Sequence, residues 1–511
     1  MDRKSPRRER SWGSALAEKK IDRLYWAGAL ILTLGVRLYL FRNYYTINND
    51  GVLYIEAARH FWEGQWVEGL ASFYPPLFPL MIVAVYPLVG DWELAGQFWP
   101  LILGVLILLP LFCLLRRVYG SRVAQVALLF YGVSPYLARL SLHVRSEIPY
   151  IFFLVLALYL LQRGMDSGSP FSLLLMGISS ALTYLIRSEG FGLLIVGALF
   201  LLYRGWIHGR LEKGILQLAI LFFGFILLAA PYILYLKQDT GRWLISRKAG
   251  LILSLGLAEL DPSAEQVGMK ESDRVSLVHL VSSRPLVYVK KIFIDAFRSL
   301  GVYFEALHYP YLPFLFIGWF FFFRGRFWEK GDFLLAATIL FYLAAFSLLY
   351  VNRRYAVPLV PLSLGWVGAG YLALKEYFHT RWGRRGYLLT GLLLVFFCIG
   401  TLPKTLKAIG REKLYLREAG LYLKGKRGNP TILTTNGRVA FYAEGQNRIL
   451  VKELRDFPAF LGAPEGDYLA LDMETFGRFE ESFKDYGWLL DREFSRGDKE
   501  RLFVFRRVGI Q

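Results

Sequence analysis

The fold is decided by the stretch LYWAGALILTLGVRLYLF, residues 24–41, which is followed directly by RNYYTINNDG, residues 42–51. The first part is apolar over nearly the length of about 20 residues that a helix needs to cross a bilayer. The second part places an acidic residue, Asp50, shortly after the end of that span. A carboxylate held at the rim of a membrane protein is costly and usually has a function. We therefore expect a membrane protein whose chemistry lies near Asp50.

The rest of the chain has the same apolar character. Of its 511 residues, 55% are hydrophobic and 16% are aromatic, and the mean hydropathy is +0.37, which is more apolar than a soluble domain. The fold class predicted is an all-α polytopic membrane protein with about eleven transmembrane helices. After residues 24–41, the apolar spans lie at 98–115, 123–140, 148–161, 171–186, 190–203, 215–236, 309–323, 333–350, 356–374 and 387–403.

The positions of the basic residues predict a topology. The net charge is +19, but the basic residues stand at the ends of apolar spans, which argues for membrane insertion and against nucleic acid as a partner. The assignment depends on the short apolar stretch 77–89. If this stretch does not cross the membrane, four basic loops lie on the same side as the basic tail 1–23. These loops are 116–122, 208–213, 324–330 and 375–385. We therefore predict an in-plane or re-entrant segment at 77–89 and a cytoplasmic N-terminus.

On this topology the chain has three parts. A basic cytoplasmic tail, 1–23, precedes a transmembrane domain at 24–403, whose outer loops are 42–97 and 237–308. The segment 404–511 follows outside the membrane and is charged, with few long apolar runs. It predicts a small soluble α/β domain with strands at 431–435 and 468–472 and helices at 411–424 and 474–486.

Two segments of the outer loops have the pattern of helices that lie in the membrane surface. In 51–64 and in 285–300, apolar residues recur at helical spacing and charged residues fall largely on the other side. This pattern is typical of amphipathic helices at the interface between lipid and water.

Several common kinds of site are not indicated. Cys113 and Cys398 lie inside apolar spans, so they are expected to act as small core residues rather than as a disulfide or a metal site. The six histidines show no pair with metal-ligand spacing on one helix. The sequence also has no phosphate-binding Gly loop and no dinucleotide fingerprint.

Two acidic residues are the candidates for catalysis. Asp50 is suited to act as a base at the membrane surface, although Asn49-Asp50-Gly51 is equally good sequence for capping the helix 51–64. Glu147 lies in a short turn between two spans and on the same predicted face. It is either a solvated turn residue or the partner of Asp50, and the pair is more informative than either residue alone.

Arginines on the same face predict a site for phosphate. Guanidinium groups bind phosphate through two hydrogen bonds, and an outer arginine runs against the usual charge distribution of a membrane protein. Arg187 ends one span and the pair Arg353 and Arg354 ends another, while Arg145 precedes Glu147. Their alternative role is to extend toward the membrane surface without binding a ligand.

Taken in order, these motifs resemble the GT-C class of integral-membrane glycosyltransferases, and most of all the bacterial relatives of dolichyl-phosphate-mannose–protein mannosyltransferases and of aminoarabinose lipid A transferases. The resemblance covers roughly residues 24–374. The matching motifs are Asn49-Asp50-Gly51 with Tyr54, Tyr74-Pro75-Pro76-Leu77, Arg145-Ser146-Glu147-Ile148-Pro149, Arg187-Ser188-Glu189-Gly190, and Arg354-Tyr355 with Pro358 and Pro361.

The resemblance implies an enzyme of the bacterial cytoplasmic membrane that acts on the outer face. Such an enzyme transfers one sugar, with inversion, from a polyprenyl-phosphate donor to a hydroxyl of a lipid, glycan or protein. Asp50 would be the base, Glu147 the second acid, and Arg187, Arg353 or Arg354, and Arg145 the groups on the donor phosphate. Among the other residues of these motifs, Tyr54, Glu189 and Tyr355 are predicted to bind substrate. His143, which falls on the same predicted face, is predicted to bind substrate as well.

Other functions remain as alternatives. A transporter or flippase for polyprenyl-linked sugars should carry charges within its spans and often inverted repeats, whereas here the charges gather on one face. A non-enzymatic envelope assembly protein would depend on the segment 404–511 and not on Asp50. No cofactor is indicated with certainty, but Asp50 and Glu147 also suit a divalent metal ion held through oxygen ligands.

Overall fold

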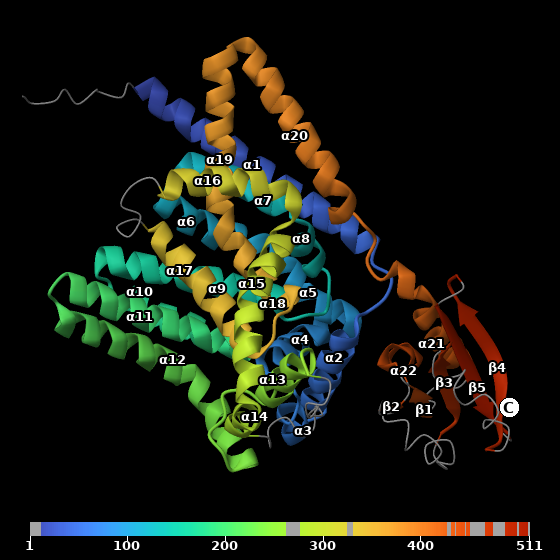
Figure 1. Ribbon diagram of the computed structural model, residues 1–511. Helices are drawn as coiled ribbons and strands as arrows, with labels where there is room; N and C mark the ends of the chain where they lie inside the picture. The colour runs from blue at the N-terminus through green and yellow to red at the C-terminus, as the bar shows by residue number, and fades with distance from the viewer. Residues whose placement is uncertain are drawn as a thin grey trace, which may run out of the picture.

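The computed structural model describes residues 12–261, 276–323, 331–426, 431–434, 436–444, 446–449, 466–473, 486–497 and 500–508. The chain forms a large bundle of helices, and a small C-terminal domain is attached to one end of it (Figure 1). We call this end of the bundle the domain end.

Long apolar helices make up the bundle, so the expected all-α polytopic class is confirmed. Among the described residues, eight segments are long and apolar enough to cross a membrane. The main helices are α1 (Trp12–Arg42), α5 (Trp92–Leu106), α6 (Leu108–Tyr119), α7 (Ser121–Val133), α9 (Glu147–Ser167), α10 (Pro170–Ile186), α11 (Phe191–Ile207), α12 (Leu211–Thr240), α16 (Leu312–Phe323), α17 (Asp332–Leu349), α19 (Val360–Trp382) and α20 (Arg384–Thr405).

Each of the eleven expected spans coincides with helical residues. The span expected at 98–115 is shared by α5 and α6, and three others fall on shorter helices, namely α7, α10 and α16. The span expected at 123–140 is divided, because α7 ends at Val133 and a short helix α8 (Pro135–Leu140) follows. The break comes at Ser134, the residue before Pro135, where a proline disfavours helical backbone. Helix α1 is longer than the span expected at 24–41 and takes in the second half of the predicted tail.

Short helices cover the domain end of the bundle. They are α2 (Asn49–Trp62), α3 (Trp66–Leu70), α4 (Leu77–Val89), α13 (Ala249–Ala258), α14 (Leu277–Ser283) and α18 (Arg353–Ala356). Helix α4 matches the short apolar stretch at 77–89 and packs against α2 and α5. At thirteen residues it is too short to cross a bilayer alone.

Helix α15 (Pro285–Leu307) is the second expected amphipathic helix, and it extends beyond residue 300. Its apolar side is turned outward, with Leu286 84% exposed and Phe293 69% exposed. Two of its charged residues are buried, and these two, Lys291 and Asp295, form an ion pair at 2.8 Å, whereas Lys290 and Arg298 are exposed. An apolar face without protein contacts is stable when lipid covers it, which fits a helix in the membrane interface.

In the part of the C-terminal domain that the structure describes, five strands form a sheet with the order β2-β1-β3-β5-β4, accompanied by two helices, which confirms the expected α/β class. Its elements are β1 (Thr431–Thr434), β2 (Gln446–Ile449), β3 (Tyr468–Asp472), β4 (Trp488–Ser495), β5 (Arg501–Arg507), α21 (Leu414–Lys426) and α22 (Gly437–Ala443). Strand β1 is parallel to β2 and β3, while β5 is antiparallel to β3 and β4. The helix expected at 474–486 falls almost entirely on residues outside those described.

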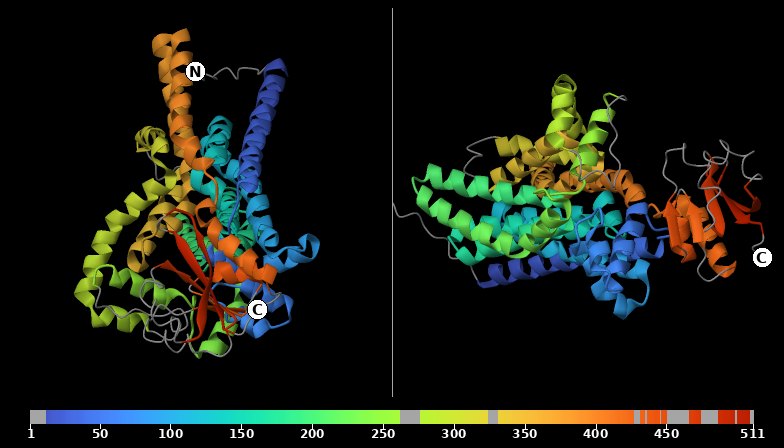
Figure 2. Two further views of the ribbon diagram at one scale, coloured as in Figure 1. Left: turned by 90° about the vertical axis from the view of Figure 1, so that its right-hand side faces the viewer. Right: turned by 90° about the horizontal axis from the view of Figure 1, so that it is seen from below.

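The domain is attached through the loop that leads from α1 into α2. Residues Tyr44 and Ile409 form a parallel β-bridge. The phenol oxygen of Tyr442 accepts a hydrogen bond from the backbone N–H of Ile47 at 2.8 Å, and its O–H donates to Glu93 at 2.9 Å. Figure 2 shows the domain at one end of the bundle and the turn between α11 and α12 at the opposite end.

Candidate active site

Asp50 lies in the first turn of α2, but it is not the helix cap. The cap is Asn48, whose Oδ1 accepts a hydrogen bond from the backbone N–H of Gly51 at 2.9 Å. The capping alternative for Asp50 is therefore wrong, because the helix begins at Asn49, two residues before the expected range 51–64, and the Asn48 side chain caps it. The Asp50 carboxylate is left to contact other groups.

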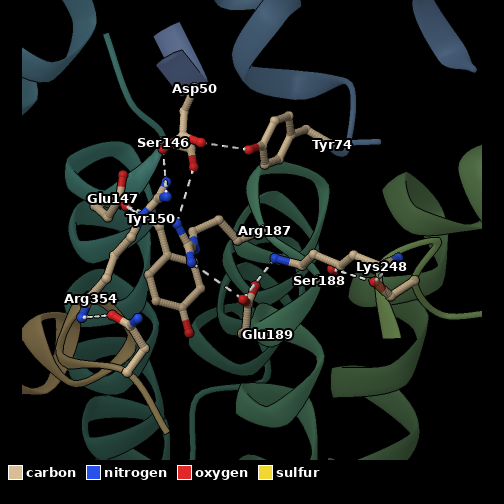
Figure 3. A network of polar contacts seen from close by, with 12 residues as sticks. Asp50, Tyr74, Ser146, Glu147, Tyr150, Arg187, Ser188, Glu189, Lys248 and Arg354 are labelled. Carbon is tan, nitrogen blue, oxygen red and sulfur yellow. Dashed lines mark hydrogen bonds and ion pairs between the residues drawn. The ribbon is translucent and has the colours of Figure 1, made fainter. Parts of the chain in front are cut away.

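Two arginines and one tyrosine bind the Asp50 carboxylate. Arg354 on α18 contacts Oδ2 at 2.6 Å, and Arg145, in the loop between α8 and α9, contacts the same oxygen at 3.1 Å. The phenol of Tyr74 donates to Oδ1 at 2.9 Å. Asp50 is thus held from three separate segments of the chain (Figure 3).

Glu147, the first residue of α9, is joined to Asp50 through Arg354. Its carboxylate forms an ion pair with the Arg354 guanidinium and a second one with Arg187 at 3.2 Å. The Glu147 side chain is 0% exposed. A buried carboxylate of this kind depends on its cationic partners, since it has no water to replace them.

Arg187 extends the network to Glu189 and Lys248. Arg187, which ends α10, contacts Glu189 at 3.3 Å, and Lys248 at the start of α13 contacts the same carboxylate at 2.8 Å. Although burial favours the neutral form, the carboxylates of Glu189 and Glu147 raise the pKa of Arg187 above its ordinary value. Burial lowers the pKa of Lys248. Together the network holds four cations and three carboxylates.

Hydroxyl groups fill the space between the charged groups. The Tyr54 phenol and Ser146 Oγ are 2.7 Å apart, and Arg187 donates to the same Ser146 oxygen at 3.4 Å. The Tyr54 ring packs on that of Tyr74, with 4.3 Å between the ring centroids. Burial raises the pKa of both phenols, so both stay protonated, and the Tyr74 O–H donates to Asp50.

His143 lies one layer behind the network. Its Nδ1 is 3.5 Å from the Asn48 amide nitrogen. Burial, with the cation of Arg145 as the next cause, lowers the pKa of His143 to about 3. It is therefore neutral near pH 7 and supports the cap of α2, without direct contact with Asp50 or Glu147.

Arg353 does not join the network, in contrast to the sequence prediction. Its guanidinium forms an ion pair with Glu305 and lies 4.8 Å from the ring of Tyr136. The adjacent Arg354 takes the inward position. Tyr355 remains next to the site, because the Arg187 guanidinium lies 5.6 Å from its ring centroid.

Three residues of the network were not predicted as site residues. Tyr74 and Ser146 belong to motifs that the sequence did single out, so their positions offered a signal. Lys248 offered none, since it is one basic residue in a long loop and its contact with Glu189 arises from the packing of α13.

Two carboxylate oxygens of the site have free hydrogen-bonding capacity. Among the described residues, Glu147 Oε2 and Glu189 Oε2 are buried and make no hydrogen bond. A buried acceptor without a partner is costly, and a hydroxyl group of a ligand would satisfy it. The described residues contain no group of three or more His, Cys, Asp or Glu side chains that would hold a metal ion. The three guanidinium groups around Asp50 and Glu147 also oppose a divalent cation there.

Comparison with known proteins adds a fold and a family match. Two solved structures cover nearly the whole chain: ArnT from Cupriavidus metallidurans bound to undecaprenyl phosphate, and the archaeal oligosaccharyltransferase AglB from Archaeoglobus fulgidus in complex with an inhibitory peptide and a dolichol-phosphate. The first has 12% identity and a TM-score of 0.58, and the match covers 95% of this chain and 98% of ArnT. The second has 13% identity and a TM-score of 0.56, and covers 96% of this chain and 75% of AglB.

This chain has the fold of the GT-C class of membrane glycosyltransferases. The family model for dolichyl-phosphate-mannose-protein mannosyltransferase matches residues 74–257, a range that contains Glu147, Arg187 and Lys248. No curated protein matches the sequence. The resemblance expected from the motifs is thereby confirmed, whereas the roles of the individual residues are developed below as proposals.

Proposed function

We propose that this protein transfers a single sugar, with inversion, from a polyprenyl-phosphate donor to a hydroxyl group of an acceptor. The observation that carries this proposal is the network at the domain end, in which Arg354 joins Asp50 to Glu147 and further cations surround them. The GT-C fold supports it, and the ArnT structure of the same fold is bound to undecaprenyl phosphate. We place the site and the C-terminal domain outside a bacterial cytoplasmic membrane, because the positive-inside rule assigns the basic loops of the sequence to the cytoplasmic side.

The cations of the network are suited to bind the phosphate group of the donor. As the sugar leaves, negative charge grows on the phosphate oxygens, and guanidinium groups stabilise that charge best when they are fixed in advance. Arg354, Arg187 and Arg145 are fixed by their contacts with the carboxylates. Each guanidinium has five N–H donors, so the contacts with carboxylates leave donors for a phosphate.

The carboxylate of Asp50 suits the acceptor. The acceptor oxygen attacks the anomeric carbon, and the bond between that carbon and the phosphate oxygen breaks, with its electron pair passing to the phosphate. The proton of the acceptor hydroxyl moves to Asp50. Attack on the side opposite to the leaving phosphate inverts the anomeric configuration. When the phosphate takes over hydrogen bonds from Arg354 and Arg145, Asp50 becomes a stronger base.

Glu147 is a positioning residue in this mechanism. It is buried between Arg354 and Arg187, so it fixes the two arginines at the phosphate. Its free oxygen, Oε2, and that of Glu189 are suited to accept hydrogen bonds from sugar hydroxyls.

Sugar transfer from a synthetic polyprenyl-phosphate sugar to a membrane extract tests the proposal. We expect the purified wild-type protein to release polyprenyl phosphate and to label one class of acceptor. Release of neither product with a panel of donors, together with movement of the donor across a vesicle membrane, would favour the transporter alternative.

A further inference from the structure

The turn between α11 and α12 lies at the end of the bundle opposite the C-terminal domain (Figure 2). A cavity of about 420 Å³ opens at this turn. It is distant from every residue assigned above. Its lining comes from the end of α9, the end of α11 and the first turns of α12. The lining residues are Met165, Arg204, Gly205, His208, Arg210, Lys213, Gly214 and Gln217.

The cavity is strongly basic and has little countercharge. Arg204 reaches Asp166 at 3.8 Å, but that carboxylate is already bound by Arg117 at 2.6 Å. Arg210 and Lys213 form no ion pair with any described residue. Cations gathered around a hollow of this size repel one another, and an anion in the hollow relieves that repulsion.

The backbone shape keeps the cavity open. Helices α11 and α12 meet through Gly205 and Gly214, where an added Cβ would lie 3.3 Å from the Arg210 carbonyl and 3.1 Å from the Leu201 carbonyl, respectively. Because the two backbones pack directly, the turn between them is tight. The basic side chains therefore surround the turn, and Gly205 and Gly214 line the cavity between them.

An exposed apolar surface lies next to the basic lining. Trp206 is 72% exposed, and Leu211 and Ile215 are 47% and 53% exposed. These residues alternate along the chain with the lining residues Gly205, Arg210 and Gly214. In a membrane protein such a surface faces acyl chains, and tryptophan is typical of the level of the lipid head groups.

We infer that this cavity binds the head group of an anionic membrane lipid, with the phosphate among Arg204, Arg210 and Lys213 and the acyl chains along α11 and α12. A basic pocket between transmembrane helices is suited to such a head group. A free phosphate ion would satisfy the charges, but it would leave the neighbouring apolar surface without a role. The inference does not depend on the proposed sugar transfer.

Lipid titration followed by native mass spectrometry tests this site on the full-length protein. The probes are phosphatidylglycerol and phosphatidylcholine of the same acyl chains. We expect the wild type to bind one phosphatidylglycerol in preference to phosphatidylcholine. The double variant Arg210→Ala/Lys213→Ala should bind phosphatidylglycerol on the order of 30-fold more weakly, since each basic residue near a membrane surface contributes about 1 kcal/mol.

The matched control is Arg384→Ala/Arg385→Ala, at the exposed start of α20. It removes the same charge from another basic loop and should change the affinity less than about twofold if the site is specific. Equal weakening by both double variants would overturn the inference in favour of unspecific attraction. Inorganic phosphate is the competitor. If millimolar phosphate binds at the wild-type cavity and displaces phosphatidylglycerol, the inference is overturned in favour of a soluble anion.

If the double variant Arg210→Ala/Lys213→Ala does not fold, a second measurement still tests the site. Brominated phosphatidylglycerol should quench part of the tryptophan fluorescence of the wild type, and this part should be missing in Trp206→Phe. Quenching that is the same in the two proteins, or the same with brominated phosphatidylcholine, would contradict the site.

Discussion

Arg354 Nη1 lies 2.6 Å from Asp50 Oδ2, although 304 residues separate the two along the chain. The same guanidinium contacts Glu147, so one side chain from α18 fixes the distance between the two acids that the sequence singles out. An arginine suits this position because its planar group offers donors in two directions at once. In the proposed mechanism, the Asp50 carboxylate stays paired with Arg354 until the donor phosphate competes for that guanidinium.

The first prediction contrasts two neighbouring arginines. Arg354→Gln should lower the free energy of unfolding by about 3–5 kcal/mol, because it leaves buried Glu147 without one of its partners. Arg353→Gln breaks a pair with Glu305 that is exposed and should cost less than about 1 kcal/mol. Thermal unfolding in detergent measures both.

A double variant makes this prediction sharper. Adding Glu147→Gln to Arg354→Gln removes the buried charge, so the double variant should be more stable than Arg354→Gln alone. If the losses of unfolding free energy in the two single variants add up to the loss in the double variant, Glu147 and Arg354 do not interact.

The second prediction concerns the attachment of the C-terminal domain. Tyr442→Phe removes the oxygen that accepts from Ile47 N–H and donates to Glu93. Because Ile47 directly precedes the cap residue Asn48, we expect a lower transfer rate and a loss of about 1–3 kcal/mol from the buried groups left without a partner.

Tyr422→Phe is the control for this change. Its O–H donates to Asp491 within the same domain, away from α2, so the transfer rate should stay at the wild-type level. A rate that is unchanged in Tyr442→Phe would show that the domain does not help to position Asp50.

The third prediction is a dependence of stability on pH. The pKa of His143 is about 3 in the folded protein and about 6.5 in the unfolded chain. Between these values the unfolded state binds a proton that the folded state does not, so stability falls as the pH decreases below about 6.5, by at most about 1.4 kcal/mol per pH unit. His143→Gln should therefore lose less stability than the wild type between pH 7.5 and pH 5. Equal losses would show that His143 does not cause the dependence.

Much of this architecture was readable from the sequence, because apolar length and basic loops obey the physics of the bilayer. Asp50, Glu147 and Arg187 were singled out because charged residues at the rim of a membrane protein are few. The sequence did not separate Arg353 from Arg354, since both end the same span and the single turn of α18 decides which side chain points inward.

Other features depend on tertiary packing. Asn48 and Asp50 are both good cap residues, and the start of α2 decides which of them caps the helix. Lys248 joins the site because the loop before α13 contacts η1 (Ser188–Gly190), with Ser246 Oγ 2.9 Å from Ser188 Oγ, and Glu189 lies in η1. The basic cavity at the turn of α11 and α12 was visible in the sequence only as the loop 208–213, a feature that membrane insertion alone explains.

Sugar transfer from a polyprenyl-phosphate sugar by Asp50→Asn, compared with Asp91→Asn, shows whether the Asp50 carboxylate acts as the base. Asp91 caps α5 by accepting from the backbone N–H of Leu94 at 2.8 Å, and it lies outside the network. A general base contributes about 10²–10⁴-fold to a rate, so Asp50→Asn should lose turnover by that factor and still bind the donor, while Asp91→Asn keeps the wild-type rate. Wild-type turnover in Asp50→Asn would contradict the account.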